Sequence, residues 1–482
     1  MTATVTIPVH TASLRLTPKV TFQASVSQSN PHTSTFLLEM HALSTLSVPF
    51  YNALRSYPGI DLPVDGTVGQ NGLVWRPRSM IPVTFTGSYA RTGHWDGLNR
   101  DNYHLISATR VEKIVFEGKR ASGVEVTARP PQPGSVLKPT KGPRIIKARK
   151  EVVLAAGAIH TPQILQLSGV GPASLLKEAK IPVVVDLPGV GANLQDHAYH
   201  PTMQYQWSNR PETPSVNVTL PQNPEFRFGP GLGLTLGLPV IAPGRYQLIA
   251  SSFAAQSPDT YLPEDVHPKV LKGYSEQQRL ISRLMLHKDF SFMSVGIGGD
   301  LTGPGPTAAP QLMHALSRGT VTINTTHPFD AEPMVDYRFA SNPLDLDLAA
   351  ENIKFFRRFF RNSTFSQYVD PIELVPGPIY ESDEKLKDWL RQNLEPTVFH
   401  PVGTAAKMPR EWGGVVSEEL EVYETEGLSV VDASVFPVLI RTATSQTVYA
   451  VAEKVSCGRL LMTFALEDGS VQLDLRSGGS AF

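Results

Sequence analysis

Apolar and polar residues alternate from Tyr103 to Val126, on both sides of the triplet Glu117-Gly118-Lys119. A period of two puts one face of a strand against a core, and glycine within the run favours a turn. The pattern therefore predicts a β-hairpin. A Pro-rich excursion over 130–143 follows it, and we expect a second pair of strands around Ile145–Ala156.

The hydrophobic period changes in the next segment. VVLAAG, at Val152–Gly157, is a short apolar run of the kind that is buried in a parallel sheet. Thr161-Pro162 is a helix start, because a hydroxyl can cap free amides and proline fits the first helical position. We expect this helix to end at about Ser168. Such a strand-turn-helix unit is typical of a doubly wound sheet, in which ligands bind at the carboxyl ends of strands.

Residues from about 200 to 330 show a different pattern, with polar aromatic strands, Pro/Gly-rich loops and a strand signal at Arg318–Asn324. These features predict an antiparallel sheet that covers the parallel one. Asn342-Pro343 then opens a helix whose apolar and aromatic residues recur every three or four positions up to Phe359. This aromatic stripe indicates a packed core rather than a contact with a cofactor.

Two further segments have weak signals. Residues 1–47 have little periodicity and many Ser, Thr and Pro, so we interpret them as loop, poor strand or disorder. Pro58–Val83 is crowded with Gly and Pro, which is typical of an irregular connection over a surface.

The candidate catalytic residues lie near the C-terminal end of the chain. His400 lies in a loop flanked by Pro and Gly, FHPVGT, and the apolar strand Leu428–Val431 stops at Asp432. A histidine in a constrained loop, beside a carboxylate at a strand end and a helix start, is well placed for proton transfer next to a bound cofactor. This segment is the candidate active site.

Composition narrows the class of protein. A chain of 482 residues with 41% hydrophobic residues can form two domains, or one large domain with an insertion. Because Lys+Arg (43) and Asp+Glu (44) nearly cancel, no nucleic-acid partner is expected. The single cysteine, Cys457, excludes a disulfide within the chain. No signal segment, membrane-spanning stretch or metal site is indicated, so the default location is the cytoplasm.

Four groups of motifs together resemble the glucose-methanol-choline (GMC) oxidoreductase family, over roughly residues 45–465. The first, GAIHTPQILQLSGVG, fits the second signature of the family at every defined position. The motifs are GAIHTPQILQLSGVG at Gly157–Gly171 followed by DLPGVGANLQDH at Asp186–His197, SRGTVTIN with SNPLDLD at Ser341–Asp347, FHPVGT with MPREWGGVV, and GLSVVDASVFP with VYAVAEK.

The resemblance implies an enzyme that binds flavin adenine dinucleotide (FAD) and oxidises a small-molecule alcohol to a carbonyl by passing hydride to the flavin. Many fungal members act in secondary-metabolite pathways. His400 matches the catalytic base of the family; the alternative interpretation is a buried structural histidine. An alcohol releases hydride readily only as its hydroxyl proton leaves, so a neutral imidazole within hydrogen-bond reach suits this role.

The resemblance also implies residues that bind FAD. Asp432-Ala433 matches the pair that approaches the ribityl and pyrophosphate groups, and the alternative is a simple helix cap. Val111 matches a position whose backbone contacts adenine in relatives, although by pattern it is an ordinary strand residue. Thr444 and Ser445 match positions at the polar edge of the flavin ring, or they cap the helix through Val451.

The implied fold class is α/β, an incomplete doubly wound FAD-binding sheet with an antiparallel substrate domain. The expected divisions are 1–47, a poorly defined N-terminal segment; 48–198, a partial FAD-binding domain; 199–395, mainly the substrate domain; 396–465, a return to the FAD-binding domain with the catalytic histidine; and 466–482, a tail.

Two departures from the family pattern stand out. The chain has no Gly-x-Gly-x-x-Gly turn to cradle the pyrophosphate, and the match starts partway through the family pattern. We therefore expect a chain shortened in evolution, or an incomplete reading of its gene, that does not bind FAD tightly on its own. The second catalytic His or Asn of the family, eleven residues past Asp432, is Ala443 here. Loss of such a group lowers a rate by about 10² to 10³-fold, unless Thr442 or Thr444 substitutes.

Two other functions remain open. Some relatives catalyse cyclisation with dehydration, for which His400 as an acid/base would suffice. The chain could also be an inactive remnant. The sequence does not indicate the substrate, the electron acceptor or the oligomeric state.

Overall fold

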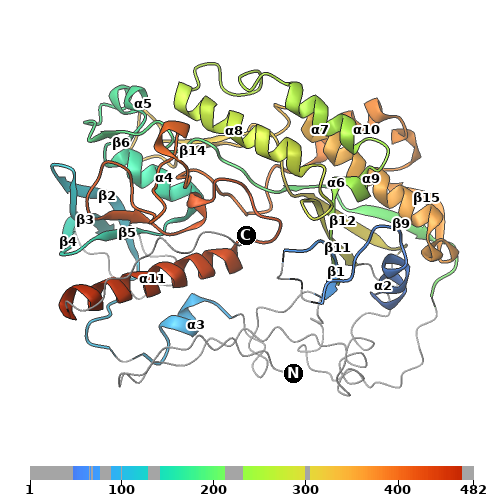
Figure 1. Cartoon of the computed structure of the whole chain (residues 1–482), viewed down its shortest axis with the longest axis horizontal. Coiled ribbons are helices and arrows are strands. Elements are labelled where there is room, and N and C mark those ends of the chain that lie inside the picture. The colour runs from blue at the N-terminus through green and yellow to red at the C-terminus, as the bar shows by residue number, and fades with distance from the viewer. Residues whose placement is uncertain are drawn as a thin grey trace.

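The structure is a computed structural model, and it describes residues 47–64, 66, 69–75, 88–98, 100–128, 142–211, 232–298 and 304–468. The predictions for residues 1–46, for most of the Pro-rich excursion and for the end of the tail lie outside these ranges. Figure 1 shows two groups of elements, with helix α8 (Pro268–Leu284) running along the top of both.

The larger group, on the right of Figure 1, contains an antiparallel sheet of seven described strands. Its order is β1-β10-β11-β12-β9-β15, and the short strand β8 also pairs with β12. The predicted antiparallel sheet is therefore confirmed. Its strands are β1 Gly72–Trp75, β8 Ala198–Tyr199, β9 Met203–Trp207, β10 Leu232–Gly237, β11 Ser291–Gly298, β12 Thr307–Leu312 and β15 Val369–Val375.

Strand β1 corrects the interpretation of Pro58–Val83 as purely irregular. Gly72 has a φ of 150°, and a Cβ there would overlap the carbonyl oxygen of Asp61. The close approach lets the Leu73 N–H donate to Asp61 O at 3.0 Å. The glycine that suggested a loop thus allows the chain to enter the sheet edge.

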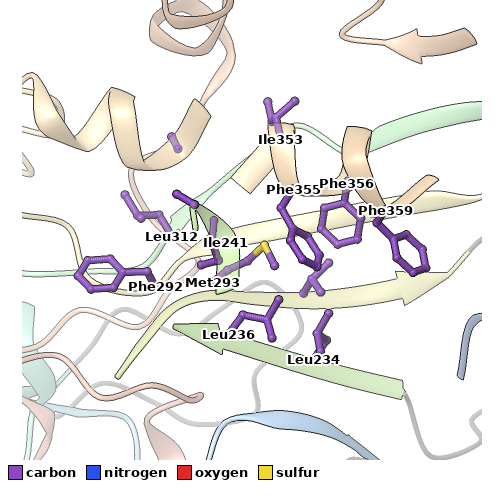
Figure 2. Close-up of a cluster of buried hydrophobic side chains, with 14 of the residues drawn as sticks. Leu234, Leu236, Ile241, Phe292, Met293, Leu312, Ile353, Phe355, Phe356 and Phe359 are labelled. Carbon is purple, nitrogen blue, oxygen red and sulfur yellow. The ribbon is translucent and has the colours of Figure 1, made fainter. Parts of the chain in front are cut away.

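Helix α9 (Leu344–Asn362) supplies the centre of this group's core. Phe355, Phe356 and Phe359 are fully buried, and Figure 2 shows them pointing from α9 toward Leu234 and Leu236 of β10. The aromatic stripe is a core, as predicted. Apolar residues of other helices enter the same core: α2 Ser47–Arg55, α6 Leu238–Ile241, α7 Tyr246–Ala255, α8 and α10 Asp383–Asn393.

The smaller group, on the left of Figure 1, begins with the predicted hairpin, β2 (Thr109–Glu117) and β3 (Arg120–Ala128). Strand β4 (Arg144–Lys147) pairs with β3. Strand β5 (Val152–Leu154) pairs in parallel with β16 (Leu428–Val430). The parallel strand is confirmed, but β4 and β5 do not pair with each other as predicted, because each finds a different partner.

Helix α4 (Gly157–Leu167) begins five residues before the predicted start at Pro162. Proline inside a helix leaves the carbonyl four residues earlier without its donor. Here that carbonyl, Ala158 O, accepts a hydrogen bond of 2.6 Å from the buried hydroxyl of Thr404. Since Thr404 follows His400 in the chain, this bond also ties the candidate active-site loop to α4.

The RGTVTIN segment forms strand β13 (Thr320–Thr322), as predicted, but it pairs with β14 (Met334–Asp336) instead of joining the large sheet. Within the described ranges no helix could cross a membrane. The proposed domain boundaries stay a prediction. The remaining elements are α3 Ala90–His94, β6 Val170–Gly171, α5 Ala173–Glu178, β7 Val185–Asp186, β13 Thr320–Thr322, β14 Met334–Asp336, α11 Ser445–Asp468 and the 3-10 turns η2 Thr364–Gln367, η3 Pro378–Tyr380, η4 Arg410–Trp412 and η5 Ala433–Val435.

Candidate active site

The loop that carries His400 is held by a segment that lies about 200 residues earlier in the sequence. Gln195 and Val402 exchange two backbone hydrogen bonds, of 3.1 and 2.9 Å. The buried carboxylate of Asp196 accepts the His400 N–H at 3.1 Å and the Thr397 hydroxyl at 2.5 Å. These bonds fix the backbone on both sides of the candidate base.

The residue before His400 has an unusual conformation. Phe399 has a φ of 62°, in the left-handed region that bulky residues avoid, and its side chain is 87% exposed. The Phe399 N–H donates to Thr397 Oγ1 at 2.8 Å, and Thr397 in turn donates to Asp196. Local hydrogen bonds therefore hold this conformation next to the candidate base.

The surroundings of Asp196 shift the pKa of its carboxyl group. Burial raises the pKa of its carboxyl group from 3.8 to about 6, although hydrogen bonds from Thr397 and from backbone amides act in the opposite direction. Because the folded protein binds this proton more tightly than the unfolded chain does, the group's stabilising effect is complete below pH 3.8 and is lost as the pH rises through about 6.

We expect Asp196→Asn to remove this pH dependence. The amide is neutral at every pH, and its oxygen can still accept the His400 N–H. The Asp196 contribution to the free energy of unfolding should fall by about 2 kcal/mol between pH 4 and pH 7 in the parent protein and stay constant in the variant. Urea unfolding at both pH values measures the difference, with the exposed residue Asp330 changed to Asn as the control. Equal pH dependence in the parent and Asp196→Asn would contradict the assignment.

The imidazole of His400 forms a pair with that of His197. Their Nδ1 atoms lie 3.0 Å apart, and the ring planes are 84° from each other. His197 is fully buried, and its Nε2 lies 2.8 Å from the carbonyl oxygen of Ile440. Burial lowers the pKa of His197 to about 3 and also lowers the pKa of the half-buried His400. Both rings are therefore neutral at pH 7.

The loop after η5 is anchored through its carbonyl groups. Pro437 O accepts hydrogen bonds from the side-chain amides of Asn193 (3.2 Å), Gln195 (3.1 Å) and Gln277 (3.0 Å). Two residues on, Leu439 O lies 2.9 Å from His314 Nε2. The carbonyl that faces His197 thus belongs to a fixed backbone.

The carboxylate of Asp432 joins two elements at the carboxyl end of β16. Its Oδ2 accepts the Gly157 N–H (2.9 Å) and the Thr161 hydroxyl (2.6 Å), which lie in the first turns of α4. Its Oδ1 accepts the N–H (2.8 Å) and the hydroxyl (2.5 Å) of Ser434. The Asp432 side chain therefore acts as a cap, which was the alternative interpretation, and only its backbone is free to face a ligand.

The other candidate residues lie apart from this hydrogen-bonded network. Val111 belongs to β2 and packs against the smaller core. Thr444 O accepts the Val448 N–H in the first turn of α11, and Ser445 is the exposed first residue of that helix. Ala443 is exposed. Among the described residues, none of these four forms a hydrogen bond with His400 or Asp432.

Sequence reasoning missed the roles of Asp196 and His197. Both lie in the motif DLPGVGANLQDH, which contributed to the family resemblance without any assigned chemistry. An acidic residue followed at once by histidine, just before a short buried strand, was the available signal. The structure shows that one residue holds the loop backbone and the next contacts the candidate base.

Two solved oxidoreductase structures have the same fold as this chain. The chain matches an FAD-dependent oxidoreductase from Chaetomium thermophilum with a TM-score of 0.75 and 32% identity, over 85% of this chain and 70% of that one. It matches a fungal aryl-alcohol oxidase with a TM-score of 0.76 and 30% identity, over 88% of this chain and 75% of that one. The chain thus has the fold of an FAD-dependent oxidoreductase.

The sequence comparisons name the family. GMC oxidoreductase profiles match residues 88–199 and 315–452. The dehydrogenase xptC of Emericella nidulans is 36% identical over 425 residues, which are 82% of this chain and 64% of that protein. The chain belongs to the GMC oxidoreductase family. It spans less than two thirds of the length of this curated relative.

FAD is the cofactor that the family and these structures indicate. The described residues fit the flavin end of this cofactor. The backbone N–H groups of Asp432 and Ala433, at the carboxyl end of a parallel strand, donate to no acceptor among the described residues and are free to bind polar groups. The sequence has no Gly-x-Gly-x-x-Gly turn to cradle the pyrophosphate.

Proposed function

We propose that the protein oxidises an alcohol to a carbonyl, with His400 as the base that takes the hydroxyl proton. The observation that carries this proposal is the state of His400. Its ring is neutral at pH 7, its Nδ1 is engaged with His197, and its Nε2 makes no hydrogen bond with any described residue. A neutral ring nitrogen without a partner is free to accept a proton from a substrate.

The reaction consists of one proton transfer and one hydride transfer. The hydroxyl proton moves to His400 Nε2 while the C–H bond of the same carbon breaks and the C=O bond forms. Bound FAD supplies the acceptor for that hydride. For holding FAD we propose the same residues that the resemblance assigned, which are Val111, Asp432, Ala433, Thr444 and Ser445. For Asp432 the free backbone N–H, rather than the carboxylate, is the group that supports the proposal.

We propose an aromatic alcohol as the substrate class, in a secondary-metabolite pathway. Support comes from the aryl-alcohol oxidase fold neighbour and from the exposed ring of Phe399 next to the base. The test is to incubate the purified chain with excess FAD, an artificial electron acceptor and a panel of benzylic alcohols, and to identify products by mass. An aldehyde formed only with FAD present supports the proposal, and the absence of a carbonyl product across aromatic and aliphatic alcohols would reject it.

The pH dependence of the rate follows from the pKa of His400. Burial lowers this pKa below its ordinary value of 6.5, and the base works only when it is neutral. We therefore expect the midpoint of the acid limb of kcat/KM to lie below pH 6.5. A pH profile from 4 to 9 measures this, and a midpoint above pH 6.5 would contradict the assignment of the base.

A non-redox cyclisation or dehydration remains the second candidate, and Ala443 favours it. An acid/base reaction needs His400 but not the second polar group that family members use at this position. Under this alternative, a substrate would lose water without any change in the oxidation state of FAD. Product mass separates the two reactions, since oxidation removes two hydrogens and dehydration removes water.

A further inference from the structure

The second member of the histidine pair has a role of its own. We infer that His197 is a positioning residue that fixes the tautomer of His400, so that the proton lies on His400 Nδ1 and the lone pair on Nε2. The inference deepens the proposed function and rests on it for its catalytic consequence. The contact between the two Nδ1 atoms keeps the proton of His400 on Nδ1 and leaves Nε2 able to accept the substrate proton.

The carbonyl of Ile440 sets the protonation of His197. A carbonyl oxygen can only accept a hydrogen bond, and His197 Nε2 lies 2.8 Å from it. Nε2 of His197 must therefore carry a proton, because two lone pairs at this distance would repel each other. The Ile440 carbonyl cannot turn away, since its neighbours Pro437 and Leu439 are held by side chains of other segments.

The second nitrogen of His197, Nδ1, acts as a hydrogen-bond acceptor. The ring is fully buried and no carboxylate from the described part of the chain contacts it. Burial keeps its pKa near 3, so it carries one proton at pH 7. Because that proton is on Nε2, Nδ1 has a lone pair and can only accept. The bond of 3.0 Å to His400 therefore has His400 Nδ1 as its donor.

The consequence lies on the far side of the His400 ring. A neutral imidazole with its proton on Nδ1 has an unprotonated Nε2, which is the nitrogen that no described residue contacts. Without an acceptor at Nδ1, His400 would populate both tautomers, and the form with Nε2–H cannot take the proton of an alcohol. His197 thus acts through His400 and does not itself need to touch the substrate.

Two substitutions at His197 separate this role from a structural one. His197→Asn places an amide oxygen near the position of Nδ1, so the acceptor for His400 is kept and the bond to Ile440 is lost. His197→Gln places its amide nitrogen near the position of Nε2, so the donor to Ile440 is kept and the acceptor is lost. We expect His197→Gln to lower kcat by about 10 to 100-fold with little change in KM, and His197→Asn to lose less than about tenfold.

The reverse order would overturn the inference. If His197→Gln keeps the parental kcat while His197→Asn loses activity, His197 only anchors the loop at Ile440. Thermal unfolding of both variants shows whether each is folded under the assay conditions, and only kcat values from folded protein enter the comparison.

A second measurement does not depend on turnover. Nuclear magnetic resonance of the full chain with ¹⁵N-labelled histidine distinguishes the two tautomers, and the signals of His400 are those absent from His400→Ala. We expect the parent protein at pH 7 to show protonated Nδ1 and unprotonated Nε2 at His400, and His197→Gln to show a mixture. A parent spectrum with protonated Nε2 at His400 would overturn the inference even if alcohols are oxidised. The expected spectrum without any alcohol oxidation would instead reject the proposed function and support the positioning role.

Discussion

His400→Ala is expected to lower kcat by about 10³-fold or more, because the substrate hydroxyl then loses its base. Acid/base groups typically contribute about 10² to 10⁴-fold, and no second polar side chain occupies the expected position at Ala443 to compensate. The fold should be unaffected, since His400 is half-buried and its backbone N–H still donates to Asp196. Steady-state rates with excess FAD and a benzylic alcohol measure the effect.

His327→Ala is the matched control for this variant. His327 is an exposed histidine between β13 and β14, and its backbone N–H donates to Asn324 Oδ1, a residue outside the site. It should keep the parental rate. A loss of less than about tenfold in folded His400→Ala would show that His400 is not the base.

Asp432→Ala is expected to lower the free energy of unfolding by about 3 kcal/mol or more. The change leaves four donors without an acceptor, namely two N–H groups and the hydroxyls of Thr161 and Ser434, and both of these residues are fully buried. It also removes the connection between the end of β16 and the start of α4. The midpoint of urea unfolding measures the loss.

Asp432→Asn and an exposed control complete this experiment. The asparagine keeps one acceptor oxygen but turns an NH₂ group toward two of the donors, so an intermediate loss is expected. Asp330→Ala, on the exposed loop after β13, should change stability by less than about 0.5 kcal/mol. A loss at Asp432→Ala as small as that of the control would mean that the four hydrogen bonds do not hold this junction together.

Local patterns in the sequence predicted the elements that depend on local chemistry. The hairpin β2–β3, the aromatic helix α9 and the parallel strands β5 and β16 all follow from hydrophobic period and turn residues. The start of α4 could not be predicted from these local patterns. Gly157 becomes the first residue of the helix because Asp432, 275 residues later, accepts its N–H, and no local rule contains that partner.

Local patterns also predicted only part of the candidate site. His400 and Asp432 could be predicted because each lies in a recognisable motif, whereas His197 acquires its role only through a residue 203 positions away. Strand β4 pairs with β3 and not with β5 for the same reason. Gly427 O and strand β16, from the C-terminal part of the chain, take the hydrogen-bonding partners of β5. The FAD contacts of Val111, Thr444 and Ser445 stay predictions.

In the proposed reaction a hydride leaves the alcohol for the flavin as His400 takes the hydroxyl proton. The most direct test is to mix the purified chain, loaded with excess FAD, with a benzylic alcohol under anaerobic conditions and to record the visible absorption of the flavin. We expect the absorption to bleach with formation of one aldehyde per reduced flavin, and to stay unchanged over the same time in His400→Ala. A flavin that remains oxidised in the parent protein with every alcohol of the panel would contradict this hydride transfer.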